Sequence, residues 1–219
     1  MKRPNQKIEI AQAKPRTASK EVRRQQLIDA TIESIAKNGL ASTTMTKVTG
    51  IAGLSLGLAN FHFTSKEKLL EETLRHVAQE HHNHWKQQID APGMSATEKL
   101  LAIVDAHFHP SICNRKKLSV WFAFYGQVGH RKLYRQIVQD IDEEREEITR
   151  NLCDQIVAEG GYDPEYALDA TLTLENLYDG QWQNMMVYPA EVTRDHAKRE
   201  IRTYLALIFP KHFTRPPKE

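Results

Sequence analysis

Apolar residues recur along most of the chain at intervals of three and four positions. Leu27, Ile28 and Ile32 follow this spacing ahead of Asn38-Gly39, as expected of a helix with one buried face and a glycine stop. The spacing returns in later segments, and no run of four to eight residues alternates apolar and polar side chains between turn signals. The sequence therefore predicts an all-α fold.

Turn and capping residues divide the chain into about nine helices. Thr64 with Glu67, and Ser95 with Glu98, have the spacing of a capping box at a helix start. After a first helix that ends at Asn38, the expected ranges are 44–52, 56–61, 66–89, 95–108, 117–128, 133–160, 163–187 (capped by Asp163, with Pro164 first) and a last helix that ends before Pro210.

The short helices 44–52 and 56–61 meet at a glycine turn, and a longer helix precedes them. This is the layout of a helix-turn-helix, whose second helix enters the DNA major groove. Val48 and Leu54 are expected to pack between the two helices, and Ser55 to cap the second. Any helical hairpin with a glycine turn looks similar, so the pattern alone leaves a purely structural hairpin open.

The exposed side of the second helix predicts which residues meet DNA. Asparagine can pair with adenine, apolar side chains can touch the thymine methyl group, and basic groups at the helix ends can meet phosphates. The predicted DNA-binding residues are Thr44, Lys47, Ser55, Leu56, Gly57, Leu58, Asn60, Phe61, His62 and Lys66.

Charge is distributed unevenly along the chain. Residues 1–66 carry 11 Lys/Arg and 4 Asp/Glu, whereas residues 67–219 carry 19 and 24, so the net charge of +2 hides a basic first third. Such asymmetry favours a nucleic-acid partner for the basic part, although a solvated basic tail would produce it too. Residues 1–19 are polar and contain two prolines, which is typical of a flexible arm.

Composition narrows the class of protein. A chain of 219 residues with 40% hydrophobic and 26% charged residues is typical of globular proteins. It holds two cysteines, Cys113 and Cys153, and no apolar segment follows the first residues as in a signal peptide, so a reduced cytoplasmic protein is expected. The uncharged stretch 48–65 is too short and polar to span a membrane.

Acidic and aromatic residues share one stripe of the predicted helix 163–187. Glu175, Asp179 and Trp182 recur there at three- and four-residue steps, and rings with a nearby carboxylate suit a quaternary ammonium cation. The predicted ligand-binding residues are His107, Trp121, Tyr125, Glu175, Tyr178, Asp179, Trp182 and Met186. Ordinary core rings and a dimer interface would explain the same residues.

Catalytic and metal motifs are missing from the sequence. His81, His82 and His84 lack the carboxylate or thiolate partners of a dedicated metal site, and there is no nucleophile elbow or glycine-rich phosphate loop. We therefore expect no metal, no cofactor and no enzyme activity. The charge run 140–147, which includes Arg145, predicts a solvated helix face.

Three segments carry a family resemblance. Arg24 to Thr31, Ala52 to Gly57 and Phe61 to Leu70 resemble the DNA-binding domain of the tetracycline-repressor (TetR) family, and the order of helices is similar throughout. Within that family, Val120 to Tyr125 and Tyr178 to Trp182 most resemble the choline-sensing repressors of betaine-synthesis genes.

The resemblance implies a ligand-responsive repressor that binds palindromic double-stranded operator DNA as a homodimer through its last two helices. It divides the chain into a DNA-binding domain, 20–66, and a ligand-binding and dimerisation domain, 67–219. The implied inducer is choline or another quaternary ammonium compound. A different aromatic or apolar inducer with unrelated target genes stays open, as do a helical-bundle enzyme or small-molecule carrier and a general DNA-coating protein.

One match and two departures bear on DNA recognition. Lys66 matches the family's phosphate-binding lysine, whereas Asn60 and His62 stand where family members usually have tyrosines. Because those tyrosine hydroxyls commonly contact phosphates, the operator sequence cannot be carried over from the family.

Overall fold

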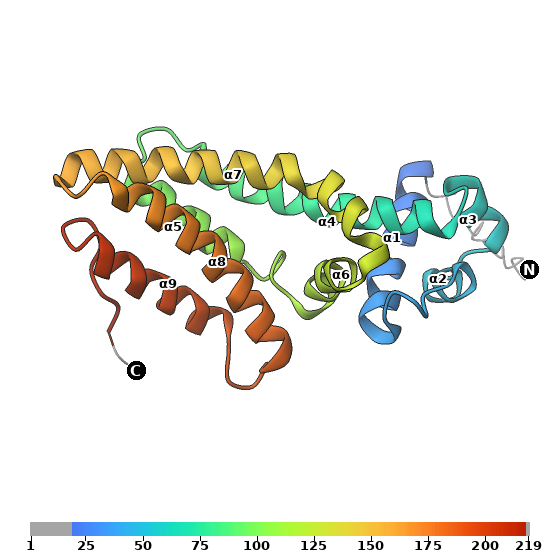
Figure 1. The fold of residues 1–219 in the computed structure, drawn as a ribbon. Coiled ribbons are helices and arrows are strands. Elements are labelled where there is room, and N and C mark those ends of the chain that lie inside the picture. The colour runs from blue at the N-terminus through green and yellow to red at the C-terminus, as the bar shows by residue number, and fades with distance from the viewer. Residues whose placement is uncertain (1–18, 218–219) are drawn as a thin grey trace, which may run out of the picture.

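A computed structural model describes residues 19–217, and within them the chain forms nine α-helices and one short 3₁₀ helix, with no strand (Figure 1). The expected all-α fold is confirmed. The predicted arm falls mostly on residues 1–18, outside the described residues. The helices are α1 (Lys20–Asn38), α2 (Met45–Ala52), α3 (Leu56–His62), α4 (Lys66–Ile89), α5 (Ala96–His107), α6 (Arg115–Gly126), η1 (Val128–His130), α7 (Arg131–Gly160), α8 (Glu165–Val187) and α9 (Arg194–Ile208).

Three predicted helix caps, Thr44, Ser55 and Ser95, are confirmed, whereas the helices predicted from residues 117 and 133 begin two residues earlier, at Arg115 and Arg131. The side chain of Thr44 accepts a hydrogen bond from the Lys47 amide at the start of α2. Ser95 and Glu98 form the full capping box at the start of α5. These bonds satisfy amide groups that have no partner inside the helix, which is why polar residues mark these starts in the sequence.

Two predicted caps are wrong by one residue, although the predicted start of α4 at Lys66 is confirmed. Ser65, not Thr64, caps α4, because the backbone is extended at Ser65 and its hydroxyl accepts a hydrogen bond from the Lys68 amide at 3.1 Å. At α8 the Asp163 carboxylate accepts from the Glu165 amide at 3.0 Å, so the helix begins one residue after Pro164.

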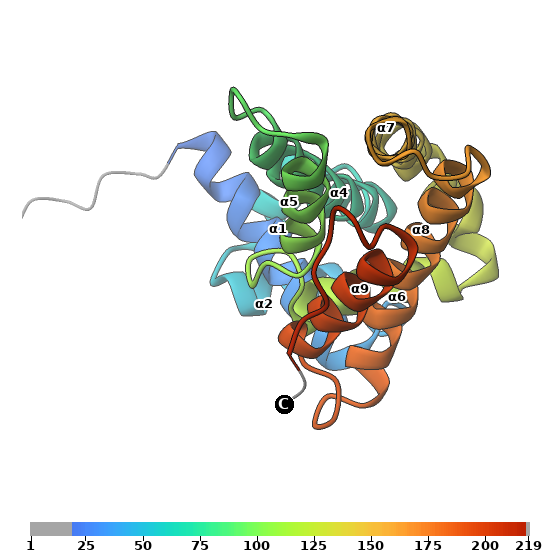
Figure 2. The ribbon, with the colours of Figure 1, turned by 90° about the vertical axis from the view of Figure 1, so that its left-hand side faces the viewer.

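The helices form an elongated bundle with α1–α3 gathered at one end (Figure 1). Helices α4 and α7 run along its length, and in the view along the axis α4, α5, α7 and α8 are seen side by side, with α9 packed on α5 and α8 (Figure 2). Buried apolar residues form one connected core, from Leu27 and Val48 at the α1–α3 end to Trp85, Phe108 and Leu174 in the bundle. Within residues 19–217 no helix is both long and apolar enough to cross a membrane.

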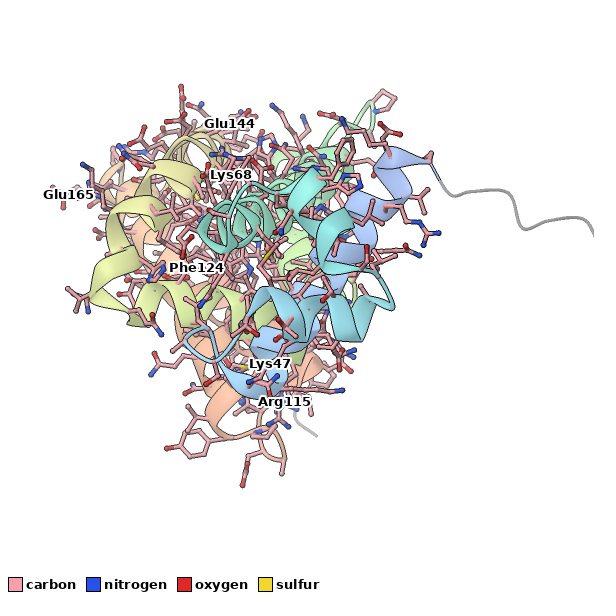
Figure 3. The ribbon with its side chains drawn as sticks, turned by 90° about the vertical axis from the view of Figure 1, so that its right-hand side faces the viewer. Lys47, Lys68, Arg115, Phe124, Glu144 and Glu165 are labelled. Carbon is pink, nitrogen blue, oxygen red and sulfur yellow. The ribbon has the colours of Figure 1, made fainter. Side chains whose placement is uncertain are left out.

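Helix α6 runs crosswise to α4 and α7 and packs on α1 (Figures 1 and 3). Near its start Lys116 pairs with Glu33 of α1, and Lys117 pairs with Glu80 of α4 at 2.5 Å. The ion pair with Lys116, with a second one to Lys37, lowers the pKa of Glu33 to about 2. These contacts fix the helix that links the α1–α3 end to the centre of the bundle.

Candidate functional site

Helices α2 and α3 meet at a tight glycine turn. Gly53 has a φ of 64°, in the left-handed region that glycine adopts without strain, and its amide donates to the Thr49 carbonyl. The next residues reverse the chain, and the Ser55 hydroxyl accepts from the Leu58 amide at 3.2 Å. Val48 is fully buried beneath the turn. The predicted helix-turn-helix geometry is therefore present.

Helix α3 turns one face inward and the other to solvent. Ala59 is fully buried and Phe63, just after the helix, is nearly so, whereas Leu56 is 46% and Phe61 69% exposed. Asn60 is exposed as well. A large exposed phenylalanine beside an exposed leucine is unfavourable in water, so this face suits contact with another molecule. Leu58 and His62 are half-buried and lie at its margin.

Basic residues flank the exposed face of α3, at the end of the molecule that Figure 3 views. Lys47 is exposed on α2 and its ammonium group donates to the Ser42 carbonyl at 2.9 Å. The Lys20 ammonium group lies 5.4 Å from the centre of the Phe61 ring. Lys66 begins α4, and no carboxylate of residues 19–217 forms an ion pair with it. Cations therefore surround an apolar, amide-bearing helix face.

A cavity of about 540 Å³ lies among α4, α5, α6, α7 and α8. Seven of the eight predicted ligand residues line it, namely His107, Trp121, Tyr125, Glu175, Tyr178, Asp179 and Trp182. His81, Phe122, Tyr134, Asp142, Arg145, Glu146, Asn176, Gly180 and Gln183 complete the wall. The cavity thus joins residues that the sequence separates by up to a hundred positions.

Aromatic rings line this cavity from its inside to its mouth. The Tyr178 and His107 rings, each 2% exposed, stack at a centroid distance of 3.9 Å. Trp182 and Trp121 continue the row with centroids 6.0 Å apart. Tyr125, 62% exposed, forms the outer end. The faces of such rings are negative and attract cations.

Carboxylates and one guanidinium group complete the wall. Arg145 is only 8% exposed, and it donates to both Glu175 oxygens, at 2.5 Å to the nearer, and to Asp142 at 2.8 Å. Burial raises the pKa of Glu175 and of Asp179, although Arg145 pulls both down. Desolvation thus destabilises the ionised carboxyl groups, and a cation in the cavity would relieve this.

Burial favours the neutral form of both cavity histidines. Burial lowers the pKa of His107 to about 3, with Arg145 adding to the effect. Burial, His107 and Arg145 likewise hold the pKa of His81 well below its usual value. Among the described residues, no group of three or more histidine, cysteine or acidic side chains is placed to hold a metal ion.

Comparisons with known proteins agree with this two-part geometry. Residues 96–210 match the family of BetI-type transcriptional repressors, C-terminal part, and residues 27–73 match the bacterial regulatory proteins of the tetR family. The HTH-type transcriptional regulator BetI of Burkholderia thailandensis is 32% identical over 168 residues, 77% of this chain and 84% of that protein. The chain belongs to the TetR family of transcriptional regulators. Another BetI, from Burkholderia lata, matches to the same extent.

Solved structures of other regulators have the same fold. A putative transcriptional regulator from Pseudomonas aeruginosa PAO1 is 25% identical, with a TM-score of 0.72 and 95% of this chain and 98% of that chain covered. A putative regulator from Saccharomonospora viridis, solved in complex with choline, has a TM-score of 0.73 at 17% identity, with 84% and 96% covered. The all-helical TetR architecture is therefore shared from end to end.

Met186 does not line the cavity of this TetR-family regulator. It lies near the end of α8 and lines a second cavity, of about 460 Å³, together with Met185 and Cys113. Its spacing from Trp182 matches the stripe, but at that depth α8 has passed the cavity and faces the segment between α5 and α6. Helical periodicity alone does not report where a cavity ends.

The sequence analysis of this TetR-family regulator missed Arg145, which is buried within the charge run. The acidic residues of the run that are exposed, as predicted for a solvated run, are Asp140, Glu143, Glu146 and Glu147. The run lies on α7, which packs on α8, and Arg145 turns inward because Glu175 of α8 faces it. A lone basic residue within an acidic run is the signal that could have found it. His81 and Tyr134 were also missed, because neither shares a periodic stripe with the predicted set.

Proposed function

We propose that this TetR-type regulator is a one-component repressor, acting in the cytoplasm on palindromic operator DNA and released by a small quaternary ammonium cation. The observation that carries this is the pairing of an exposed apolar recognition face on α3 with an anionic, ring-lined cavity in the same chain. Residues 20–66 would read DNA, and residues 67–219 would bind the ligand and dimerise.

On the DNA side, the exposed residues Leu56, Gly57, Asn60 and Phe61 would face base edges in the major groove. Asn60 can bond bidentately to adenine, and Leu56 and Phe61 suit thymine methyl groups, so the half-site would contain A·T pairs. Thr44, Lys47, Ser55, Leu58, His62 and Lys66 border this face and would contact phosphates or position α3. The start of α4 adds a helix N-terminus that attracts a phosphate near Lys66.

The dimer would form through α8 and α9. Leu168 and Leu172 on α8 are each 45% exposed, and Leu207 on α9 is 66% exposed. Apolar side chains on the outer faces of two adjacent helices favour a self-complementary contact across a two-fold axis. A two-fold dimer presents two α3 helices about 34–36 Å apart, so it reads a palindrome.

On the ligand side, the cavity suits a cation with methyl groups. Rings attract a desolvated cation by about 2 kcal/mol or more, and Asp179, the carboxylate outside the Arg145 network, can neutralise it. Choline is the first candidate, and the choline complex of the Saccharomonospora viridis regulator supports this choice. The ligand would release DNA if it binds more tightly to a conformation in which the two α3 helices are not spaced for the operator. Bound DNA and bound ligand must then lower each other's affinity by the same factor.

A fluorescence-anisotropy titration at fixed salt tests both halves. The full-length protein is titrated with the palindromic part of its own upstream region and with a scrambled duplex, and choline is then added to the complex. We expect a preference for the native duplex of about 10³ or more and release by choline. Specific DNA binding that choline does not affect would support the repressor hypothesis and exclude choline as the ligand. Equal binding to both duplexes would exclude the repressor hypothesis and favour the alternatives, a general DNA-coating protein or an enzyme.

A further inference from the structure

The inner wall of the cavity presents one oriented imidazole that cation binding leaves unused. His107 closes α5, and its Nδ1 lies 3.0 Å from the main-chain oxygen of Ile103. A carbonyl oxygen can only accept a hydrogen bond, so Nδ1 must carry the ring proton. The neutral ring then exposes an unprotonated Nε2.

The Nε2 atom of His107 is an acceptor without a partner. It makes no hydrogen bond to any of residues 19–217, yet His107 lines the cavity. Burial keeps the ring neutral by lowering the pKa of His107 to about 3, so Nε2 remains an acceptor at neutral pH. Nε2 is not among the fully buried atoms that lack a partner, so it is open to the cavity, and a ligand hydroxyl there would find an acceptor that no described protein group occupies.

Neighbouring groups hold the ring in place. Tyr178 stacks on it with an interplanar angle of 12°, and His81 packs edge-on with a centroid distance of 4.6 Å. The Trp182 indole donates to the His107 carbonyl at 3.2 Å, which joins the end of α5 to α8. The ring cannot turn without breaking the bond to Ile103, so the acceptor is fixed before any ligand arrives.

We propose that His107 Nε2 accepts a hydrogen bond from a hydroxyl group of the bound cation, which makes the cavity selective for a quaternary ammonium alcohol. This inference rests on the cation binding proposed above. The cationic end would lie against Trp121 and Trp182, and the ring of Trp182 is 6.0 Å from that of His107. An alcohol joined to the ammonium group by a short spacer can reach both.

Other oxygen groups do not suit this position. An ether, aldehyde or carboxylate oxygen has no proton, so its lone pairs would face the lone pair of Nε2. A carboxylate would also find no available cation, because Arg145 already donates to Glu175 and Asp142. The site is therefore expected to bind the alcohol more tightly than its oxidised and O-methylated relatives, because only the alcohol has a hydroxyl proton to donate to Nε2.

Calorimetric titration of the full-length protein tests the inference with choline, its O-methyl ether and glycine betaine as probes. The wild type is expected to bind choline about tenfold more tightly than the ether, because the ether leaves two acceptors facing each other. Glycine betaine is expected to bind more weakly than choline. In His107→Phe the preference for choline over the ether is expected to fall below about twofold, whereas His107→Gln, which keeps an acceptor, restores part of it. His84→Phe, which changes an α4 histidine that does not line the cavity, is the matched control and keeps the wild-type preference.

The outcomes separate this inference from the proposed function. Equal wild-type affinity for choline and the ether overturns the role of His107 and leaves cation binding intact. A preference retained in a folded His107→Phe protein, as judged by circular dichroism, overturns it as well. Failure of the wild type to bind either cation overturns the proposed function together with this inference. The wild-type comparison decides the matter even if His107→Phe does not fold.

Discussion

The outer face of α3 and the inner wall of the cavity differ in how their side chains are held. Leu56, Asn60 and Phe61 stand on one short helix with few neighbours, and DNA would be their main contact. Arg145, by contrast, is held by carboxylates from two helices, and His107 by a carbonyl and stacked rings. A reading face can therefore change without loss of fold, whereas the cavity wall is part of the stability of the protein.

Removal of Arg145 should break the cavity wall most severely. In Arg145→Met the carboxylates of Glu175 and Asp142 lose their buried partner, and the free energy of unfolding should fall by about 3 kcal/mol or more. Urea unfolding followed by circular dichroism measures this. Arg150→Met is the control, because its pair with Asp154 is exposed and worth under about 1 kcal/mol. Equal losses of unfolding free energy in Arg145→Met and Arg150→Met would show that the buried network does not contribute more to stability than an exposed ion pair.

The recognition face should show the opposite behaviour. Asn60→Ala and Phe61→Ala are each expected to weaken binding to the operator by about 10- to 100-fold, the value of a specific base contact, with the melting temperature nearly unchanged. Anisotropy and thermal unfolding measure the two effects. Val22→Ala, an exposed apolar residue of α1, is the control. A loss of stability that matches the loss of affinity would show that α3 is held like the cavity.

Lowering the pH should reduce the free energy of unfolding through His107. The folded pKa of about 3 lies below the usual unfolded value of about 6.5, so the unfolded chain binds more protons below pH 6.5 and stability falls as the pH drops. Between pH 7 and pH 5 the expected loss is about 1–2 kcal/mol.

Comparison with His107→Phe isolates this effect, since the variant lacks the titrating ring. His81 acts in the same direction, whereas the raised pKa values of Glu175 and Asp179 oppose it, and Arg145 is common to both proteins. Urea unfolding at the two pH values gives the slopes. Identical slopes in the wild type and the variant would exclude His107 as the cause.

The smallest effect concerns the start of α4, which joins the two regions. Ser65→Ala removes the cap and should lower the free energy of unfolding by about 1 kcal/mol. Thr64→Ala, one residue earlier, is the control and should change it by less than about 0.5 kcal/mol. A larger loss of stability in Thr64→Ala than in Ser65→Ala would instead support Thr64 as the cap, as predicted from the sequence.

These differences explain what could be predicted from the sequence. The turn at Gly53 and the capping box at Ser95 and Glu98 depend on residues close together in the chain, so local patterns reveal them. The stripe on α8 likewise indicated Glu175 and Trp182. Local patterns cannot show which helix faces a given residue.

The errors arose where distant helices decide the outcome. Arg145 was placed in solvent because only its contact with Glu175, thirty positions away, turns it inward. Met186 shares the stripe of α8 but faces a different set of helices. The orientation of the His107 ring depends on Ile103 and Tyr178 together, which no periodicity reports.

The crosswise placement of α6 has a consequence for the construction of hybrid regulators. A cut at the proposed boundary between residues 66 and 67 would exchange the proposed DNA-binding domain and keep the proposed ligand-binding domain. Such a graft would set a foreign α1 against α6 and remove Glu33 from Lys116, although Lys117 would keep Glu80 on α4. Only five residue steps of α6, about 8 Å along the helix axis, separate Lys116 at this seam from Trp121 at the cavity. A hybrid that keeps residues 67–219 of this regulator would therefore also need the residues of its own α1 that face α6.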